Sequence, residues 1–202
     1  MNRTLIVMVK EPHPGRVKTR LGKDIGLVPA AWWFRHQVST LLRRIEDPRW
    51  QVVLAVSPDV EGVQSRVWPA HLPRWGQGGG DLGARMARML CSVEGGSACV
   101  IGADIPGIQR SHIWEAFKVL GQNDAVFGPA PDGGYWLVGL KHPRRQPHGI
   151  FKGVRWSTKQ ALADSMATLP DYRIARVATL RDVDNGDDLL MTRTGSRANS
   201  IT

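Results

Sequence analysis

The stretch Thr4-Leu5-Ile6-Val7-Met8-Val9, followed by the turn Pro12-His13-Pro14-Gly15, decides how the chain folds. Its continuous run of apolar, mostly branched side chains predicts a buried strand, which the proline and glycine residues end. A second apolar run, Val52 to Val56, stops at Ser57-Pro58-Asp59, and a third extends from Ala98 to Ala103. The chain therefore contains at least three strands that are apolar on both faces.

Helical periodicity lies between these strands. Apolar residues from Pro29 to Ile45 recur at helical spacing, and Asp81 is a suitable cap for a helix that extends to about Val93. Strands of this kind that alternate with helices are typical of a parallel sheet covered on both sides. The predicted fold class is therefore α/β.

The second half of the chain continues this alternation with one exception. Tyr135 to Leu140 follows the turn Pro131-Asp132-Gly133-Gly134 without a crossover helix, which predicts an antiparallel or edge strand. The other expected elements are a helix over 111–120 capped by Ser111, a strand over 125–127, a helix over 157–168 capped by Ser157, and a last strand over 173–180. We expect one domain over residues 1–190 and a flexible tail over residues 191–202, which are mostly small and polar.

The composition narrows the classes of function. The 202 residues are 42% hydrophobic and 22% charged, as in ordinary globular proteins. The sequence has no membrane-spanning run and no secretory signal pattern, so we expect a cytoplasmic protein with no membrane partner. A net charge of +9 suits a phosphorylated ligand, but the absence of a known nucleic-acid-binding motif argues against nucleic acid as the main partner. Cys91 and Cys99 have no zinc-type spacing and are expected to be core thiols. The sequence does not define an oligomeric state.

The loop after the first strand carries a cluster of cations. It contains Pro14, Gly15, Arg16, Lys18 and Arg20, and its glycine permits a ligand to approach the backbone closely. In an open α/β sheet, ligands bind beyond the carboxyl ends of the strands, so this loop is a candidate for binding the phosphates of a nucleotide. The alternative is a solvated basic turn.

Carboxylates follow two later strands. Asp104 ends the strand from Ala98, and Asp182 and Asp184 follow the last strand with the same orientation in an extended segment. Magnesium or manganese takes one or two protein carboxylates together with substrate phosphates, so we expect Asp104 and Asp184 to hold the metal. The choice between Asp182 and Asp184 as the second ligand stays open, and Asp104 can alternatively cap a turn before Pro106.

The turn before the antiparallel strand is a candidate acceptor site. Gly133 and Gly134 permit close approach of a ligand, and Tyr135 and Trp136 offer a flat apolar surface beside the carboxylate of Asp132, a candidate general base. A plain hairpin turn is the alternative.

A glycine-rich loop precedes the helix that Asp81 caps. Gly78-Gly79-Gly80-Asp81-Leu82-Gly83 matches the spacing of a dinucleotide fingerprint, but the segment before it is a poor strand. We therefore expect Gly80, Asp81 and Arg85 to lie against a nucleotide and its phosphates, with nicotinamide or flavin binding as an alternative.

Together these segments resemble the DUF2064 glycosyltransferase-like family of the nucleotide-diphospho-sugar transferase superfamily. The resemblance extends from residue 10 to residue 189, and its stretches are Lys10 to Leu21, Gly80 to Met86, Gly102 to Pro106, Gly128 to Tyr135, Trp156 to Thr158 and Asp182 to Leu189. It implies a three-layer GT-A fold with a mostly parallel twisted sheet and an antiparallel strand. It also implies nucleotide binding at the loop containing Arg16 and a divalent metal at Asp104.

One departure from the superfamily leaves the reaction open. GT-A glycosyltransferases usually carry an Asp-x-Asp pair, whereas Asp104-Ile105-Pro106 is similar to the single carboxylate of molybdenum-cofactor guanylyltransferases and 2-phospholactate guanylyltransferase. We expect a metal-dependent transferase that moves a glycosyl group from a nucleotide-diphospho-sugar to a small-molecule acceptor. The alternatives are a nucleotidyltransferase that releases pyrophosphate from a nucleoside triphosphate, and a non-catalytic nucleotide sensor. The base, the sugar and the acceptor are not defined.

Overall fold

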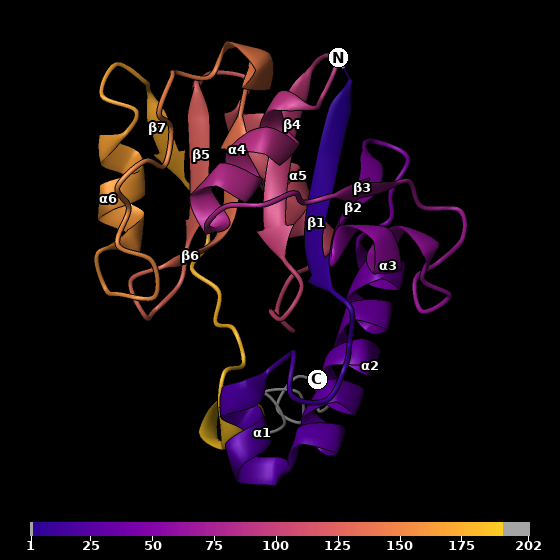
Figure 1. Ribbon diagram of the computed structural model, residues 1–202. Coiled ribbons are helices and arrows are strands. Elements are labelled where there is room, and N and C mark those ends of the chain that lie inside the picture. The colour runs from indigo at the N-terminus through magenta and orange to yellow at the C-terminus, as the bar shows by residue number, and fades with distance from the viewer. Residues whose placement is uncertain (1, 192–202) are drawn as a thin grey trace, which may run out of the picture.

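The computed structural model describes residues 2–191 and shows a seven-stranded sheet between two layers of helices (Figure 1). The strand order is β3-β2-β1-β4-β6-β5-β7. The strands are β1 (Arg3–Lys10), β2 (Gln51–Ser57), β3 (Arg74–Gly76), β4 (Ser97–Gly102), β5 (Ala125–Pro129), β6 (Tyr135–Leu140) and β7 (Ile174–Arg176). The predicted α/β class is confirmed. Of the tail expected over 191–202, only Met191 is described, at the end of a helical segment, and residues 192–202 lie outside the described residues.

Strand β1 lies in the middle of the sheet because both of its faces are apolar. It pairs in parallel with β2 and β4, with Ile6 level with Val53 and Val100. Leu5, Val7 and Val9 enter one core layer and Ile6 enters the other, so successive side chains contribute to opposite faces. All four of these side chains are buried.

Helices cover both faces. Helix α2 (Leu27–Ile45) and helix α5 (Arg110–Val119) pack on one core layer, and helix α4 (Leu82–Cys91) and helix α6 (Ala161–Ala167) pack on the other. The short elements are α1 (Thr19–Ile25), α3 (Asp59–Gln64) and the 3-10 turn η1 (Pro143–Arg145). No helix among residues 2–191 has the length and apolar character needed to cross a membrane.

Strand β6 confirms the expected antiparallel element. It lies between β4 and β5 and is antiparallel to both, with Val138 level with Val100 and Phe127. This arrangement brings the turn at 130–134 to the carboxyl end of β4, the same edge at which β1 and β2 end. The candidate acceptor turn and the cationic loop therefore lie at one edge of the sheet.

Two predicted helix caps are wrong. Ser111 lies inside α5, because Gln109 precedes the helix and its backbone N–H donates to Nδ1 of His112 (3.1 Å). Ser157 lies four residues before the start of α6 and has a left-handed backbone (φ 60°). The cap expected at Asp81 is confirmed, because its carboxylate accepts from the backbone N–H of Ala84 (2.8 Å).

The expected last strand is shorter than predicted. Only Ile174–Arg176 pairs regularly with β5, and the segment that follows is irregular. Two bonds still hold it against β5, from the Val177 N–H to the Phe127 carbonyl (2.9 Å) and from the Leu180 N–H to the Pro129 carbonyl (3.1 Å). The segment then crosses below the sheet toward α1, where residues 186–191 form one more helical segment (Figure 1).

Candidate active site

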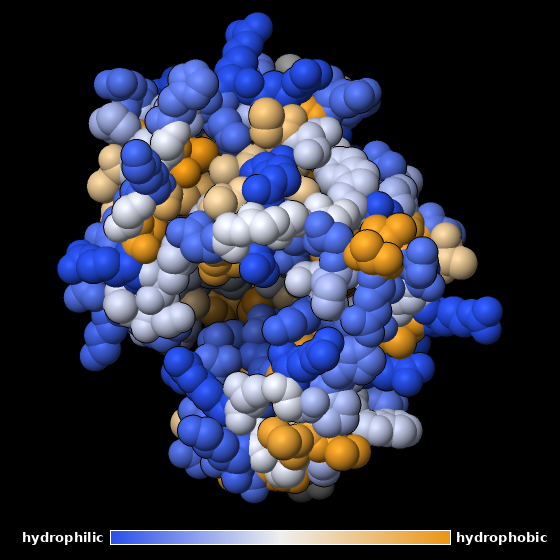
Figure 2. Space-filling view, in the orientation of Figure 1, coloured by the Kyte–Doolittle hydropathy of each residue, from blue (hydrophilic) through white to orange (hydrophobic). Residues whose placement is uncertain are grey.

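A cleft of about 510 Å³ lies at the carboxyl edge of the sheet. Figure 2 shows a hollow in this face with apolar surface at its back and hydrophilic side chains around it. The cleft extends from the ends of β1, β2 and β3, past β4, to the start of β6. Its position agrees with the rule that open α/β sheets bind ligands beyond the carboxyl ends of their strands.

Three carboxylates meet in this cleft. Asp104 follows β4, while Asp182 and Asp184 come from the irregular segment near the end of the described chain. One carboxylate oxygen from each lies within 4.8 Å of the others, and all three side chains are partly buried. Oxygen atoms so grouped suit a hard divalent cation. The carboxylates predicted from the sequence therefore come together, and Asp182 lies with them as well.

Two cations of the N-terminal loop face these carboxylates. Lys18 Nζ lies 2.5 Å from Asp104 Oδ2 and 2.8 Å from Asp184 Oδ1, and its side chain is only 7% exposed. Arg20 Nη1 lies 3.3 Å from Asp184 Oδ2, with a side chain that is 69% exposed. The loop that the sequence associates with phosphate thus contacts the carboxylates directly.

The segment that carries the two later carboxylates is fixed in place at several points. The Val183 N–H donates to the Asp104 carbonyl (3.2 Å), and the side chain of Val183 is fully buried between Leu21 and Ala30. The indole Nε1 of Trp136 donates to the Ala178 carbonyl (2.8 Å). These contacts align residues far apart in the sequence, so the carboxylates are positioned by tertiary packing.

The site perturbs two ionisable groups. Burial alone would lower the pKa of Lys18, but the attraction of Asp104 and Asp184 exceeds that effect and raises it, so the ammonium stays charged. Burial raises the pKa of Asp182 to about 6, and the neighbouring carboxylates of Asp184 and Asp104 add to this rise. A partly buried carboxylate beside two others is a favourable place for a cation.

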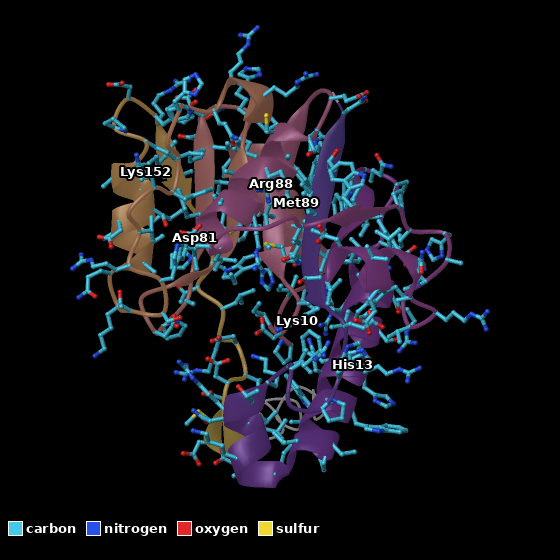
Figure 3. The ribbon with its side chains drawn as sticks, in the orientation of Figure 1. Lys10, His13, Asp81, Arg88, Met89 and Lys152 are labelled. Carbon is cyan, nitrogen blue, oxygen red and sulfur yellow. The ribbon has the colours of Figure 1, made fainter. Side chains whose placement is uncertain are left out.

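The glycine-rich loop lies beside the cleft. Gly80 has a left-handed backbone (φ 99°), and Arg85, which lines the cleft, donates from Nε to the Gly80 carbonyl (3.0 Å). Arg88 on α4 donates to the Gln77 carbonyl (2.5 Å) and the Gly79 carbonyl (3.1 Å), which holds the loop in position (Figure 3). Asp81 is occupied as the cap of α4.

The other end of the cleft is formed by the turn before β6. Asp132 lines the cleft and its Oδ1 accepts from the Gly134 N–H (2.9 Å). Gly133 has φ 90°, and a Cβ atom there would lie 2.3 Å from the Lys159 carbonyl oxygen, so a glycine is required. Tyr135 lines the cleft, and burial raises the pKa of its hydroxyl, which accepts from Ser165 Oγ (3.1 Å) and stays protonated. Trp136 also lines the cleft but is only 3% exposed.

Some predicted residues do not line the cleft. Pro14, Gly15 and Arg16 are exposed on the loop between β1 and α1, and neither they nor Gly80 and Asp81 are among the described residues that form its wall. Figure 3 shows this loop leading from Lys10, at the end of β1, to His13.

The wall also contains residues that were not among the predicted site residues, including Lys10, Gln77, Trp156 and Ser157. Lys10 directly follows β1, so the rule that selected Asp104 could have selected it. Gln77 is buried and donates from Nε2 to the Val9 and Ala55 carbonyls, a role with no sequence signal. Trp156 and Ser157 lie in a stretch of family resemblance, which marked them without assigning a role.

A larger cavity, of about 1050 Å³, lies at the opposite edge of the sheet. Arg3, Trp50 and Arg88 are among its lining residues, and Arg49 there is paired with Asp47 (2.7 Å). This cavity lies near the start of β1 and β2 and contains no group of acidic ligands among residues 2–191. The smaller cleft is therefore the candidate active site.

One family model matches the central part of the chain. A family described as an uncharacterized protein conserved in bacteria (DUF2064) matches residues 40–158, more than half of the chain. The match includes Asp104 and Asp132 and excludes the cationic loop and the last two carboxylates. No curated protein matches the chain.

Solved structures share the fold over nearly the whole chain. A candidate nucleotide-diphospho-sugar transferase from Desulfovibrio desulfuricans G20 is 28% identical, with a TM-score of 0.85, over 96% of this chain and 88% of that one. A CMP:2-keto-3-deoxy-manno-octonic acid synthetase complexed with CTP is 12% identical, with a TM-score of 0.61, over 98% and 100% of the two chains. Rv0371c from Mycobacterium tuberculosis H37Rv in complex with manganese is 13% identical, with a TM-score of 0.55, over 95% and 97%. The last two likenesses concern the fold alone.

Proposed function

The chain belongs to the DUF2064 family, and from that premise we propose that it is a metal-dependent transferase that moves a glycosyl group from a nucleotide-diphospho-sugar to a small acceptor. One observation carries the proposal, namely that Asp104, Asp182 and Asp184 converge opposite Lys18 and Arg20 in a cleft at the carboxyl edge of the sheet. The 28% identical solved structure, a candidate nucleotide-diphospho-sugar transferase, supports the donor class.

The three carboxylates are the residues that would hold magnesium or manganese. They supply only oxygen ligands, and they come from two segments that a backbone hydrogen bond connects. Burial and the neighbouring carboxylates raise the pKa of Asp182, and a bound cation would relieve that effect. A divalent cation bound there supplies charge neutralisation for a leaving nucleoside diphosphate. The manganese complex of a structure with the same fold is consistent with this assignment.

The donor is proposed to lie over the ends of β1, β2 and β3. Lys10, Arg20 and Arg85 line that part of the cleft and can bind phosphate oxygens, while Leu82 and Met86 provide apolar surface for a base. Gly80 leaves the backbone of the glycine-rich loop accessible beside them. Pro14, Gly15, Arg16 and Asp81 are proposed to contribute from the edge of the cleft.

The acceptor is proposed to lie at the other end, near Asp132, Gly134, Tyr135 and Trp156. Asp132 takes the proton from the acceptor hydroxyl as its oxygen bonds to the anomeric carbon, and the bond from that carbon to the phosphate oxygen breaks to release the nucleoside diphosphate. Gly133 and Trp136 shape this end from behind. Because no Lys or Arg belongs to this stretch of the wall, we expect an acceptor without a phosphate group at the reacting end.

Nucleotidyl transfer is the second candidate, and one observation favours it. Asp104 is followed by Ile105 and Pro106, so the strand end contributes a single carboxylate in place of an Asp-x-Asp pair. In that reaction the acceptor oxygen attacks the α-phosphorus of a nucleoside triphosphate, and pyrophosphate leaves from the same cationic surface.

Product analysis tests the proposal. The protein is incubated with nucleotide sugars or with nucleoside triphosphates, in magnesium or manganese, and nucleoside diphosphate and pyrophosphate are quantified separately. We expect nucleoside diphosphate release that stops with a chelator and with Asp104→Asn, but not with the exposed control Asp171→Asn. Release of pyrophosphate would replace glycosyl transfer by nucleotidyl transfer, and binding without either product would favour the sensor hypothesis.

A further inference from the structure

The ammonium group of Lys18 contacts two of the three carboxylates that would hold a cation. Nζ is 2.5 Å from Asp104 Oδ2 and 2.8 Å from Asp184 Oδ1, and those two residues also supply two of the three clustered ligand oxygens. The Lys18 side chain is nearly buried, so the two carboxylates and not water stabilise its positive charge. An ammonium and a divalent cation cannot share these oxygens, because like charges would lie about 3 Å apart at low dielectric.

The backbone of Lys18 is adapted to this position. Its φ of 45° and ψ of 47° are left-handed, a conformation that only three non-glycine residues adopt among residues 2–191. The residue stands at the start of α1, where its carbonyl accepts from the Gly22 N–H (2.8 Å). A residue that keeps a disfavoured backbone conformation is held there by its surroundings, and the two ion pairs of Lys18 are part of these surroundings.

Lys18 does not neutralise the whole negative charge of the three carboxylates. Asp182 makes no ion pair within the described part of the chain, and Arg20 reaches only Asp184, at 3.3 Å and largely in solvent. One lysine therefore neutralises part of a three-carboxylate cluster. A divalent cation would neutralise more of it, provided that the displaced ammonium finds another anion.

We propose that Lys18 is a tethered cation that pairs with Asp104 and Asp184 before a divalent metal binds, and that moves to phosphate oxygens when the metal enters together with a nucleotide. The inference rests on the proposed function, because it needs both the metal and the phosphates. Lys18 has a flexible four-carbon stem and lies in the chain between Lys10 and Arg20, which both line the proposed donor end of the cleft, so phosphate oxygens bound there would be the new partner of the same side chain. The consequence is that metal alone binds weakly and that metal and phosphate strengthen each other's binding.

The first arm of the test measures the metal alone. Binding of Mn²⁺ is followed by electron paramagnetic resonance of the free ion, using the full chain without nucleotide. We expect Lys18→Met to bind Mn²⁺ at least about tenfold more tightly than the parent protein, since a competing charge has been removed. Lys18→Gly is the second variant, because glycine suits the left-handed backbone and protects against loss of folding.

The matched control is Arg20→Met, which removes one positive charge beside the same carboxylate but from an exposed position. We expect a change of at most about threefold, because solvent screens that charge. If the Arg20 and Lys18 variants gained Mn²⁺ affinity equally, the loss of one positive charge anywhere near the site would explain the result, and the proposal would be overturned.

The second arm measures the phosphate end by titrating inorganic pyrophosphate in saturating Mg²⁺. We expect about tenfold weaker binding to Lys18→Gly than to the parent protein, because one charge-assisted contact is lost. If pyrophosphate bound equally to the parent protein and to Lys18→Gly, or bound to neither, the proposed contact between the Lys18 ammonium and phosphate would be overturned.

The outcomes separate this inference from the function on which it rests. If the parent protein binds Mn²⁺, Asp104→Asn abolishes that binding and the Lys18 variants bind no more tightly, the exchange is refuted while the metal site stands. If no protein binds Mn²⁺, including the Lys18 variants, both the exchange and the metal-dependent function are refuted.

Discussion

Replacing Asp182 with asparagine tests whether the carboxylate cluster is under electrostatic stress without metal. Asp182 is partly buried beside Asp184 and Asp104, and its pKa is raised from 3.8 to about 6. Ionising this group therefore costs free energy in the folded protein that it does not cost in the unfolded chain. An amide of nearly the same size removes that cost, so we expect Asp182→Asn to be more stable than the parent protein.

The size and the pH range of this effect follow from the shift. Two pH units correspond to at most about 3 kcal/mol, and screening by solvent at a partly exposed group reduces this to about 1–2 kcal/mol. Because the native state keeps its proton to a higher pH, the parent protein loses stability as the pH rises from about 4 to about 6 and stays at the lower value above that range. The advantage of Asp182→Asn should be near zero at pH 4 and complete at pH 8.

Urea unfolding in a chelator, followed at a series of pH values, measures this difference. Asp171→Asn is the matched control, because it makes the same change at an exposed turn and should give no pH-dependent gain. The reasoning is refuted if Asp182→Asn is destabilised at pH 8, or if its advantage is constant across the range. The same variant should bind Mn²⁺ more weakly, so that stability and metal binding change in opposite directions.

Three further predictions concern other parts of the molecule. In Gly139→Ala the added Cβ would lie 2.6 Å from the Sγ of Cys99, so urea unfolding should show a loss of about 1–3 kcal/mol, whereas Gly79→Ala, which meets nothing within 4 Å, should show little. Trp136→Phe removes the indole hydrogen bond to the segment that carries Asp182 and Asp184, so Mn²⁺ titration should show binding weakened about fivefold. Unchanged Mn²⁺ binding would contradict a positioning role for Trp136. Arg16→Ala should raise the KM for a nucleotide donor about tenfold without changing the unfolding free energy, and an unchanged KM would remove this exposed side chain from the phosphate site.

The sheet and the later carboxylates were predictable because each rests on a local pattern. Continuous apolar runs identified β1, β2 and β4, and the absence of a crossover helix identified β6 as antiparallel. The rule that ligands meet the carboxyl ends of strands then identified Asp104, Asp182 and Asp184 as candidate metal ligands from the sequence alone.

The features that were missed depend on tertiary contacts. Strand β3 has three residues and is a strand only because it pairs with β2, and α1 is too short to stand out by periodicity. The ion pairs of Lys18 join positions 86 and 166 residues apart, and they require a left-handed backbone that no pattern around a lysine signals. The cap expected at Ser111 was wrong because the helix begins earlier, at Arg110, where the backbone N–H of the preceding Gln109 donates to the His112 side chain.

The Val183 N–H that binds the Asp104 carbonyl has a consequence for biosynthesis. A nascent chain that has left the ribosome only as far as β6 can pair most of its strands, yet it holds only one of the three carboxylates of the proposed metal site. A ligand that needs all three carboxylates could therefore stabilise only molecules whose translation has passed this segment. A chain that ended between β7 and Asp182 would, by the same reasoning, keep all seven strands and lose two of the three carboxylates.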